Sequence, residues 1–419
     1  VVVLLLALLT FLFWWLWGAG HWPWLLASGP GEATTAAGLA LQLAIAVLVV
    51  ACPCALGLAT PTAITVGTGQ AARAGLLFRG GDAIETASRV ATVLFDKTGT
   101  LTLGLPSVTR VLPARWRGPG REDRILAVAA ALEKDSRHPL SHALLQEAQR
   151  RAIALPPVED VRHEVGDGME GHQAATDPPL PVRVGRLAWL GQRGVSGPAA
   201  SEDAVLTLEK SGASLLGVAE AGSLLGLVAV EDQLRDDAPA TLEALRRQGL
   251  RLGLLSGDHR SSVSSLAVRL GLDGELVAWD LRPEQKLGRI DAVRLSGPVA
   301  MVGDGINDAP ALAASDLGVA VGSGTSIAQE TADLVVMGDR LEGLADALQI
   351  ARRTMRKVRQ NLLLAFGYNL ITLPIAAGLL LPGLGLRLHP PLAALMMAAS
   401  SITVVANALL LQDGAKTAE

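Results

Sequence analysis

Three short apolar segments in the middle of the sequence each end in an acidic turn. The segment at residues 90–95 is followed by Asp96, the one at 250–255 by Ser256-Gly257-Asp258, and the one at 299–302 by Gly303-Asp304-Gly305. Each is followed by a stretch typical of a helix, as in a doubly wound parallel sheet. Because ligands collect at the carboxyl ends of the strands in such sheets, we expect the three turns to form one site.

The residue types at these turns could transfer a phosphoryl group. A carboxylate can attack the terminal phosphate of ATP only if magnesium and a cation offset the repulsion between the two anions. The sequence offers Asp96 as nucleophile, Asp304 as magnesium ligand and Lys286 as cation. The other polar groups expected around the phosphate are Thr98, Ser256, Asn307 and Asp308.

Thr98, two residues after the nucleophile, distinguishes two kinds of chemistry. Phosphatases of this sheet type carry a second Asp there, which acts as general acid and base to hydrolyse the aspartyl phosphate. This chain has threonine instead. We therefore expect the phosphoenzyme to persist until another group hydrolyses it, as an energy-coupling intermediate must.

The composition places part of the chain in a membrane. Of 419 residues, 50% are hydrophobic and 18% are charged, and the apolar residues gather towards the two ends. A helix needs about 20 apolar residues to span a bilayer. This predicts spans at about residues 1–17, 36–66, 362–381 and 391–411, the second interrupted by Pro53 and Pro61. The net charge of −4 and the scattered basic residues give no stripe of the kind that nucleic acid needs, so we expect no nucleic-acid partner.

Basic residues orient these spans. Arg73, Arg79 and Arg89 follow the second span and a cluster of Arg and Lys at 352–359 precedes the third, whereas the loop at 18–38 has neither. By the positive-inside tendency, the large middle part is cytoplasmic. We expect an integral protein of a lipid bilayer, in a bacterial inner membrane.

The only cysteines, Cys52 and Cys54, flank Pro53 within the second span. Their spacing is unfavourable for a mutual disulfide bond, so we expect a pair of thiolates. Proline removes a backbone donor and kinks or unwinds the helix, which turns both cysteines towards one side. Thiolates select soft ions such as Cu(I), Ag(I), Zn(II) or Cd(II).

The later spans narrow the choice of ion. The third contains Tyr368-Asn369 and the fourth contains Met397 with Ser400-Ser401, groups that are costly or without use in lipid unless they face a path. Neither helix interior contains Lys, Asp, Glu or His. A thioether together with thiolates favours a monovalent soft ion. Met396 is the alternative ligand to Met397, because neighbouring residues point in different directions around a helix.

Composition also predicts a second soluble module, inserted between the first and second strands of the parallel sheet, because Pro/Gly-rich breaks appear between residues 108 and 225. The expected divisions are membrane helices at 1–82, the phosphorylation domain at 83–107 and 226–351, the inserted module at 108–225, and membrane helices at 352–419. The expected fold class is an α-helical membrane domain with α/β cytoplasmic domains: a Rossmann-type parallel sheet and an inserted α+β module.

Asp96 to Thr100 (DKTGT), Ser256-Gly257-Asp258 and Gly303 to Leu312 (GDGINDAPAL) resemble the signature set of P-type ATPases, and the resemblance spans nearly the whole chain. Cys52-Pro53-Cys54 and His138-Pro139 resemble the heavy-metal-transporting branch, and the Tyr-Asn and Met-x-x-Ser-Ser patterns resemble its Cu(I)-exporting subgroup. The resemblance implies a HAD-like phosphorylation domain, and an enzyme that uses ATP and Mg²⁺ to export Cu(I) or Ag(I).

The resemblance also implies roles for single residues. Asp96 would be phosphorylated, with magnesium held by Asp96, Thr98 and Asp304. The rest of the catalytic set would be Lys97, Ser256, Gly257, Asp258, Lys286, Asn307 and Asp308. The inserted module would bind the nucleotide through Glu133, His138, Gly166, Gly168 and Gly185. The transported ion would be bound by Cys52, Cys54, Tyr368, Asn369, Met397 and Ser401.

Some positions depart from the usual pattern of this family. Arg137 stands where Glu commonly precedes His-Pro, Ser256 replaces the usual Thr, and Arg186 follows Gly185 where Asn is common. Serine keeps the hydroxyl group that contacts phosphate. Without the resemblance, the residues allow a second interpretation of His138 besides nucleotide contact: a surface residue just before a helix that begins near Ser136 and Pro139.

The family also has an actuator domain, in which the Glu of a Thr-Gly-Glu loop directs water onto the aspartyl phosphate. This tripeptide is absent from the sequence, which opens Val1-Val2-Val3 without Met. We therefore expect an N-terminally truncated chain that needs its actuator domain for a full cycle, and a copper chaperone as metal donor. The alternatives are a Zn(II) or Cd(II) pump, or a fragment that binds metal or nucleotide without pumping.

Overall fold

The computed structural model describes residues 2–26, 35–52, 54–114, 120–136, 138–164, 167–174, 178–196, 205, 208, 212–304, 308–322, 330–338 and 340–411. The chain divides into two compact units. The first, the helical unit, contains Val1–Arg89 and Asp346–Glu419. The second, the α/β unit, contains Val90–Ala345.

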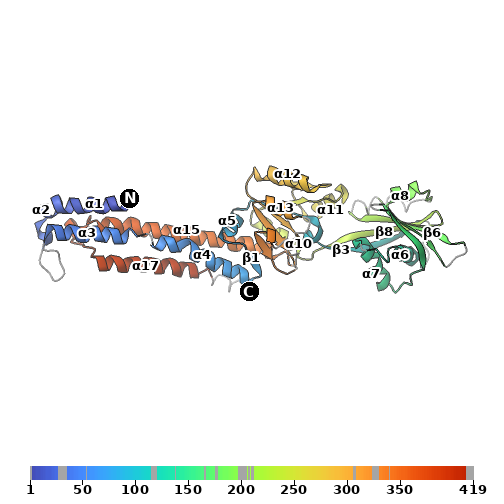
Figure 1. Cartoon of the computed structure of the whole chain (residues 1–419), viewed down its shortest axis with the longest axis horizontal. Coiled ribbons are helices and arrows are strands. Elements are labelled where there is room, and N and C mark those ends of the chain that lie inside the picture. Colours follow the sequence, from blue (N-terminus) through green and yellow to red (C-terminus); the bar gives the residue numbers. More distant parts are fainter. Residues whose placement is uncertain are drawn as a thin grey trace. The chain divides into compact units, whose positions relative to one another are not determined.

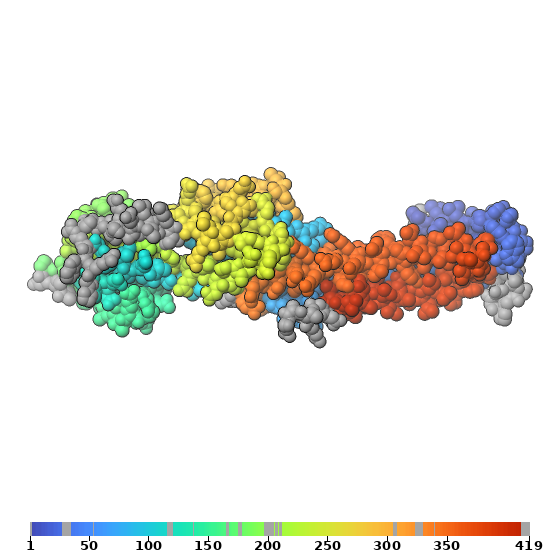
Figure 2. Space-filling view, turned by 180° about the vertical axis from the view of Figure 1, so that it is seen from behind, coloured from blue at the N-terminus to red at the C-terminus, as the bar shows by residue number. Residues whose placement is uncertain are grey.

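The helical unit consists of long apolar segments, whose backbone groups can all be bonded within a helix. Its N-terminal part contains α1 (Val2–Phe13), the turn η1 (Trp14–Gly18), α2 (Ala19–His21), η2 (Pro23–Leu26), α3 (Ala36–Val50), α4 (Cys54–Arg73), β1 (Leu76–Phe78) and α5 (Gly81–Arg89). Its C-terminal part contains most of α15 (Gly343–Ala376), then α16 (Leu381–Leu384) and α17 (Pro390–Leu409). α17 packs against both α3 and α4 (Figure 1), and Figure 2 shows α15 and α17 as adjoining orange and red surfaces.

Three segments of the described chain are long and apolar enough to cross a membrane: Val2–His21, Ala36–Arg73 and Pro390–Leu409. They correspond to the first, second and fourth expected spans. The second is broken where the sequence places Pro53, since α3 ends at Val50 and α4 begins at Cys54. Pro61, however, lies inside α4 and does not interrupt it, contrary to expectation. Proline is tolerated inside such helices because neighbouring groups and local adjustments can satisfy the freed backbone carbonyl.

The third expected span, residues 362–381, does not pass the same test of length and apolarity. α15 ends at Ala376, and its apolar part includes Tyr368, Asn369 and Pro374, which lower its mean hydropathy. The face that it turns outward is nevertheless apolar, with these side chains 60–77% exposed: Leu363, Phe366, Leu370 and Ile371. A membrane crossing by α15 therefore stays a prediction.

The predicted parallel sheet is confirmed in the α/β unit. The strands before the acidic turns are β2 (Thr92–Phe95), β9 (Arg251–Leu255) and β11 (Val299–Gly303). Within this unit the strand order is β13-β12-β11-β2-β9-β10, and each neighbouring pair is parallel. The sheet is completed by β10 (Val277–Ala278), β12 (Leu317–Val321) and β13 (Leu334–Val336), and its helices are α10 (Ala238–Arg247), α11 (Arg260–Leu270), η4 (Gly274–Leu276), α12 (Pro283–Arg294) and α13 (Ala309–Ala314). β2, β11 and β12 are buried along their whole length, as strands covered on both faces are.

An antiparallel sheet is inserted between β2 and β9, in the order β3-β8-β7-β6-β5-β4. Its strands are β3 (Thr102–Pro113), β4 (Val158–Glu164), β5 (Gly168–Gln173), β6 (Leu180–Gly185), β7 (Ser214–Glu220) and β8 (Ser223–Leu234), and its helices are α6 (Arg121–Leu132), α7 (Pro139–Arg150) and α8 (Leu187–Gln192). β3 and β8 pair from Thr102 and Leu234 to Pro113 and Gly226. The expected divisions at 107/108 and 225/226 thus fall inside this strand pair, because the change in composition does not mark the ends of the ladder.

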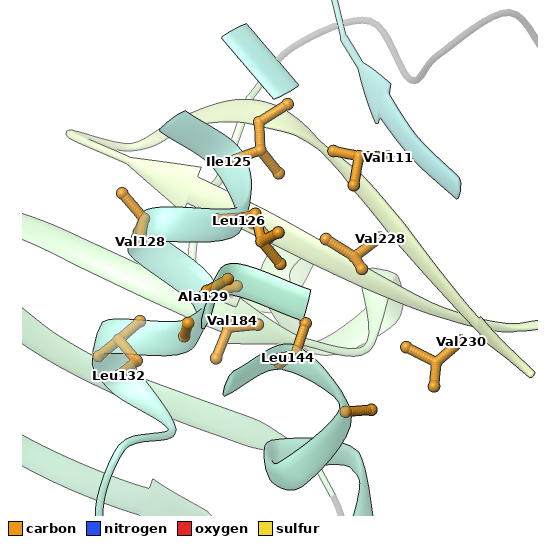
Figure 3. Close-up of a cluster of buried hydrophobic side chains, with 14 of the residues drawn as sticks. Val111, Ile125, Leu126, Val128, Ala129, Leu132, Leu144, Val184, Val228 and Val230 are labelled. Atoms are coloured by element: carbon orange, nitrogen blue, oxygen red, sulfur yellow. The ribbon is translucent and has the colours of Figure 1, made fainter. Parts of the chain in front are cut away.

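The inserted module has its own hydrophobic core, in which α6 and α7 pack on the antiparallel sheet (Figure 3). Leu126 of α6 and Leu144 of α7 are fully buried, as are Val184 of β6 and Val228 of β8. Burial of such side chains contributes roughly 1.5–3 kcal/mol each. The module therefore holds its shape through this core.

Leu144→Ala should destabilise the inserted module by about 2–5 kcal/mol, because it leaves a cavity among fully buried side chains. Native-state hydrogen exchange of the backbone amides of α6 and α7 would measure the change in this module. Val161→Ala is the matched control, since Val161 is 42% exposed. Equal losses in the two variants would contradict this account of the core.

Candidate functional site

Asp96 lies at the carboxyl end of the parallel sheet, directly after β2. Its backbone N–H donates to the carbonyl of Val302, which continues the β2–β11 ladder by one residue (2.9 Å). Its carboxylate accepts a hydrogen bond from the backbone N–H of Thr98 (3.0 Å). Asp96 is only 7% exposed, whereas the Thr98 side chain is exposed. The turn Lys97–Leu101 (η3) thus covers the carboxylate and presents Thr98 to solvent.

Lys286 of α12 joins two carboxylates. Its ammonium group donates to Oδ1 of Asp96 at 2.6 Å and to Oδ1 of Asp308 at 2.7 Å. Asp308 precedes α13, but its side chain makes no capping hydrogen bond there. A helix-capping role therefore does not explain Asp308, which is 2% exposed and turned towards Lys286.

The surroundings shift the protonation of these groups. Burial raises the pKa of Asp96 to about 7, the negative charge of Asp308 adds to this shift, and Lys286 opposes it. Burial by itself lowers the pKa of Lys286, but the charges of Asp96 and Asp308 outweigh burial, so this pKa is raised. The two carboxylates, Asp96 and Asp308, thus carry more negative charge than the ammonium group of Lys286 neutralises.

Asp304, after β11, lies against the turn that follows Asp96. Gly99 has φ of +76°, and a Cβ there would lie 2.7 Å from Oδ2 of Asp304. Asp304 also raises the pKa of Asp96 through its charge. Glycine at position 99 therefore lets the turns after β2 and β11 meet.

The residues of this site fit Mg²⁺. Among the described residues, no group of three or more His, Cys, Asp or Glu side chains is close enough to hold one metal ion. Mg²⁺, however, is usually bound by one or two carboxylates and completes its shell with water and phosphate oxygens. Asp96 and Asp304 supply oxygen ligands and excess negative charge, so they suit this ion.

The turn after β9 brings a hydroxyl group to the site. Ser256 is 3% exposed, and its Oγ accepts a hydrogen bond from the N–H of Asp258 (3.1 Å). The hydroxyl proton of Ser256 remains available to an anion. Gly257 and Asp258 line a cleft of about 600 Å³ that also includes Lys97.

Lys97 is directed away from Asp96. Its ammonium group donates to Asp258 and, at 2.7 Å, to Oγ of Ser262 in α11. Ser262 is not among the site residues predicted from the sequence. Serine is common at exposed helix positions, and no spacing rule connects it to Lys97, so the sequence holds no signal for this contact.

Half-buried Asp232 of β8 and buried Arg235, just after β8, also support the turn that follows Asp96. Thr102 donates to Asp232, whose pKa is raised by burial. The guanidinium group of Arg235 donates to the carbonyl of Gly99 (3.1 Å). Sequence reasoning missed both residues, because only the pairing of β3 with β8 brings them to this turn.

A second cavity, of about 230 Å³, lies in the inserted module. It contains Glu133, His138, Gly168 and Gly185, the described members of the expected nucleotide set, and also Arg186. Gly166 and Asn307 lie outside the residues that the structure describes. The structure therefore brings four of the five expected nucleotide residues to one cavity.

His138 both begins a helix and lines this cavity. Its Nδ1 accepts a hydrogen bond from the N–H of Leu140 at the start of α7 (3.2 Å). Neutral imidazole carries its proton on one nitrogen. Because Nδ1 accepts, Nε2 is the donor that can face a ligand.

The two glycines of this cavity are required by packing. A Cβ at Gly168 would lie 2.4 Å from the carbonyl of Val184, and one at Gly185 would lie 2.4 Å from the carbonyl of Asp167. The ring of Trp189 approaches both positions closely. Their identity is therefore explained by the fold whether or not a nucleotide binds.

In the helical unit, Cys52 and Cys54 are free thiols with their sulfur atoms 2.6 Å apart. The helix faces next to Cys54 belong to α15 and α17, because Ala55 packs with Ala365 and Val404. The remaining candidate ligands are half-buried. On α15 they lie within two helical turns of Ala365, and on α17 within two turns of Val404: Tyr368, Asn369, Met397 and Ser401. The alternative ligand, Met396, packs against an apolar cluster of α1, α3 and α15.

Asp96→Asn should stabilise the magnesium-free chain at about pH 8, since it removes a buried negative charge. The folded chain holds the Asp96 proton more tightly than the unfolded chain does, so the stability from this group is complete below about pH 4 and is lost as pH rises through about 7. Thermal unfolding with a chelator present should show a gain for the Asn variant that narrows on acidification. A gain independent of pH would contradict this origin.

Residues 90–316 match the family described as haloacid dehalogenase-like hydrolases, and residues 296–348 match a second family of the same description. The chain is 40% identical over 351 residues to a probable copper-exporting P-type ATPase of Archaeoglobus fulgidus, and 39% identical over 356 residues to a silver exporting P-type ATPase of Salmonella typhimurium. Each alignment covers 84% of this chain and 42% of the relative, so the chain spans less than half the length of these proteins.

Among solved structures, the chain resembles a zinc-transporting PIB-type ATPase in its E2.Pi state. The TM-score is 0.80 at 35% sequence identity, and the match covers 98% of this chain and 62% of the other. This likeness includes both the α/β unit and the helical unit. The chain therefore belongs to the haloacid dehalogenase-like hydrolases and, among them, to the heavy-metal P-type ATPase family.

Proposed function

We propose that this chain contains the phosphorylation, nucleotide-binding and ion-binding parts of an ATP-driven exporter of a soft monovalent metal ion, Cu(I) or Ag(I). The observation that carries the proposal is the buried Asp96 at the end of β2, held by Lys286 and opposite Asp308. Family membership supports the reaction class. The names of the relatives, copper-exporting and silver exporting, support the ion.

In the proposed step, a carboxylate oxygen of Asp96 bonds to the terminal phosphorus of ATP. The bond from that phosphorus to the bridging oxygen breaks, and ADP leaves with the electron pair. Asp96 and Asp304, near Thr98, would hold Mg²⁺, which would supply positive charge against the phosphate oxygens. Lys286 offsets further negative charge, and the hydroxyl group of Ser256 donates to a phosphate oxygen.

The phosphorylated Asp96 is proposed to persist. Thr98, the exposed residue two positions later, has no carboxyl group that could activate water. Hydrolysis would then depend on the actuator domain that we expect elsewhere in the protein. Such a delay lets the energy of ATP drive a change in the helices before it is lost as heat.

Nucleotide binding is proposed for the cavity of the inserted module. His138 would donate from Nε2 to the base, and Glu133 lines the same cavity with its carboxylate already bound by the hydroxyl of Ser141 (2.5 Å). The backbone of Gly168 and Gly185 would let a ring approach closely. The cleft lined by Lys97 and Asp258 would receive the phosphates.

For the transported ion, the proposed ligands are Cys52, Cys54, Tyr368, Asn369, Met397 and Ser401. Among the described residues, no cluster of three or more His, Cys, Asp or Glu side chains competes with this site. Sulfur ligands suit soft ions. The likeness to a zinc-transporting ATPase keeps Zn(II) or Cd(II) as the alternative cargo.

The setting of the protein is proposed on the same basis. The helices long and apolar enough to cross a membrane support a location in a lipid bilayer. A bacterial inner membrane with the α/β unit in the cytoplasm would agree with the distribution of basic residues. A copper chaperone would deliver the ion.

Incubation of the purified chain with radiolabelled ATP and Mg²⁺ tests this proposal. Cu(I) or Ag(I) should stimulate acid-stable labelling, and Asp96→Asn should abolish it, because the nucleophile is lost. Asp291→Asn is the matched control, since Asp291 on α12 has a side chain that is 67% exposed. Its labelling should equal that of the unaltered chain.

Two results would count against the proposal. Stimulation by Zn(II) or Cd(II) alone would assign a divalent cargo and leave the phosphoryl transfer intact. Absence of label under every ion would instead favour a chain that binds metal or nucleotide without pumping.

A further inference from the structure

Three polar side chains form a hydrogen-bonded chain across the helical unit. Lys357 of α15 donates to Oδ1 of Asn407 in α17 (2.9 Å). Nδ2 of Asn407 donates to Oδ1 of Asn361 in α15 (2.7 Å). Nδ2 of Asn361 donates to the backbone carbonyl of Ala59 in α4 (3.3 Å). One continuous chain of bonds thus connects α15, α17 and α4.

The direction of this chain is fixed at both ends. The ammonium group of Lys357 can only donate, and the carbonyl of Ala59 can only accept. Each amide between them must therefore turn its oxygen towards Lys357 and its nitrogen towards α4. A flip of Asn361 or Asn407 would oppose donor to donor and acceptor to acceptor, so only one arrangement satisfies every group.

Asn361 is fully buried where an apolar residue would serve for packing alone. It is 0% exposed, although its neighbours along the α4 contact are apolar: Ala63 packs with Val358, and Ala55 packs with Ala365. Burying an amide costs free energy unless it is hydrogen-bonded. Intramembrane polar side chains are therefore candidates for function rather than for stability.

The contact between α4 and α15 is close enough for the register of α4 to matter. The α4 side of the contact repeats every fourth residue and is made of small residues: Ala55, Ala59, Ala63 and Gly67. A Cβ at Gly67 would lie 2.2 Å from the hydroxyl oxygen of Thr354. Small residues let helices approach closely, and polar side chains such as Asn361 can then hydrogen-bond from one helix to the next.

Along all three helices, the hydrogen-bonded groups are displaced from the candidate ion ligands in the same direction. Ala59 is five residues beyond Cys54 on α4, which corresponds to about 7 Å of helix. Asn361 precedes Tyr368 by seven residues on α15, about 10 Å. Asn407 follows Ser401 by six residues on α17, about 9 Å. These offsets are alike. The hydrogen-bonded side chains therefore lie at one level along the helix axes, displaced from all the proposed ligands towards the start of α15.

We propose that Asn361 and Asn407, anchored by Lys357, form a latch that sets the height of α4 against α15 and α17 and so positions the Cys52/Cys54 pair. The inference rests on the proposed ion transport and deepens it, because it names residues that set the geometry of the ion site without touching the ion. The latch residues are positioning residues.

The test measures Cu(I) affinity and stoichiometry of the purified full chain in detergent, by competition with a coloured Cu(I) chelator. Asn361→Leu removes both hydrogen bonds of this residue. Asn361→Asp keeps the shape and the bond from Asn407 and removes the donor to Ala59. The negative charge that it adds can pair with Lys357 one turn away. Gln360→Leu is the matched control, since Gln360 is the exposed neighbouring amide.

Both Asn361 variants should bind the same number of Cu(I) ions with affinity lowered about tenfold or more, as when a residue that orients metal ligands is lost. Gln360→Leu should bind like the unaltered chain. A purely structural role would lower the stoichiometry by unfolding and leave the remaining sites unchanged. If Asn361→Leu fails to fold, the Cu(I) affinity of Asn361→Asp tests the proposal.

Unchanged Cu(I) affinity in Asn361→Asp at full stoichiometry would overturn the latch and leave the proposed function standing. A parallel titration with Zn(II) separates the two claims. If the unaltered chain binds Zn(II) and not Cu(I), the proposed cargo is wrong, and a tenfold loss of Zn(II) affinity in Asn361→Asp would still support the latch. An unaltered chain that binds neither ion would overturn both.

Discussion

Lys286 holds two buried carboxylates, Asp96 and Asp308, at distances of 2.6 and 2.7 Å. Burial, and after it the charges of Asp308 and Asp304 that one ammonium group does not neutralise, raise the pKa of Asp96 to about 7. The parallel sheet makes this crowding possible, because β2 and β11 end side by side and each delivers a carboxylate at its carboxyl end. A site with surplus negative charge is prepared for a divalent cation and a phosphate that arrive together.

The two units of the chain use opposite ligand chemistry. The α/β unit presents hard oxygen groups and an ammonium group, which suit magnesium and phosphate. The helical unit presents sulfur at a break between α3 and α4, which suits a soft ion. In the helical unit the fully buried Asn361 is hydrogen-bonded to the carbonyl of Ala59 and to Asn407. Precise placement of a few polar groups is therefore the shared requirement of both units.

Much of the fold could be predicted from the sequence. Runs of apolar residues that end in an acidic turn have the length of buried strands, and these became β2, β9 and β11. The break at Cys52-Pro53-Cys54 followed from the chemistry of proline. The limits of the inserted module did not follow, because β3 and β8 extend past the change in composition that suggested them. The helix that contains the third expected span, α15, begins far upstream at Gly343 and ends at Ala376, and its membrane crossing stays a prediction.

The candidate site was predictable where the residue types are unusual and not where they are common. One Asp after a buried strand is often only a helix cap, but Asp96 and Asp304 stand out because such turns recur at one sheet edge, together with Lys286. Ser262, Asp232 and Arg235 reach the site only through tertiary pairing, so no local pattern announces them. Asn361 and Asn407 are 46 residues apart, and their contact depends on how α15 and α17 pack.

The central claim is that Lys286 makes phosphorylation of Asp96 possible by offsetting charge. Lys286→Met, with Arg289→Met on the exposed side of the same helix as control, tests it through the rate of labelling from ATP and the affinity for ATP measured separately. The account predicts that Lys286→Met loses labelling by at least about a hundredfold and keeps its ATP affinity, because the lost interaction belongs to the transferred phosphate. Undiminished labelling in Lys286→Met would contradict it.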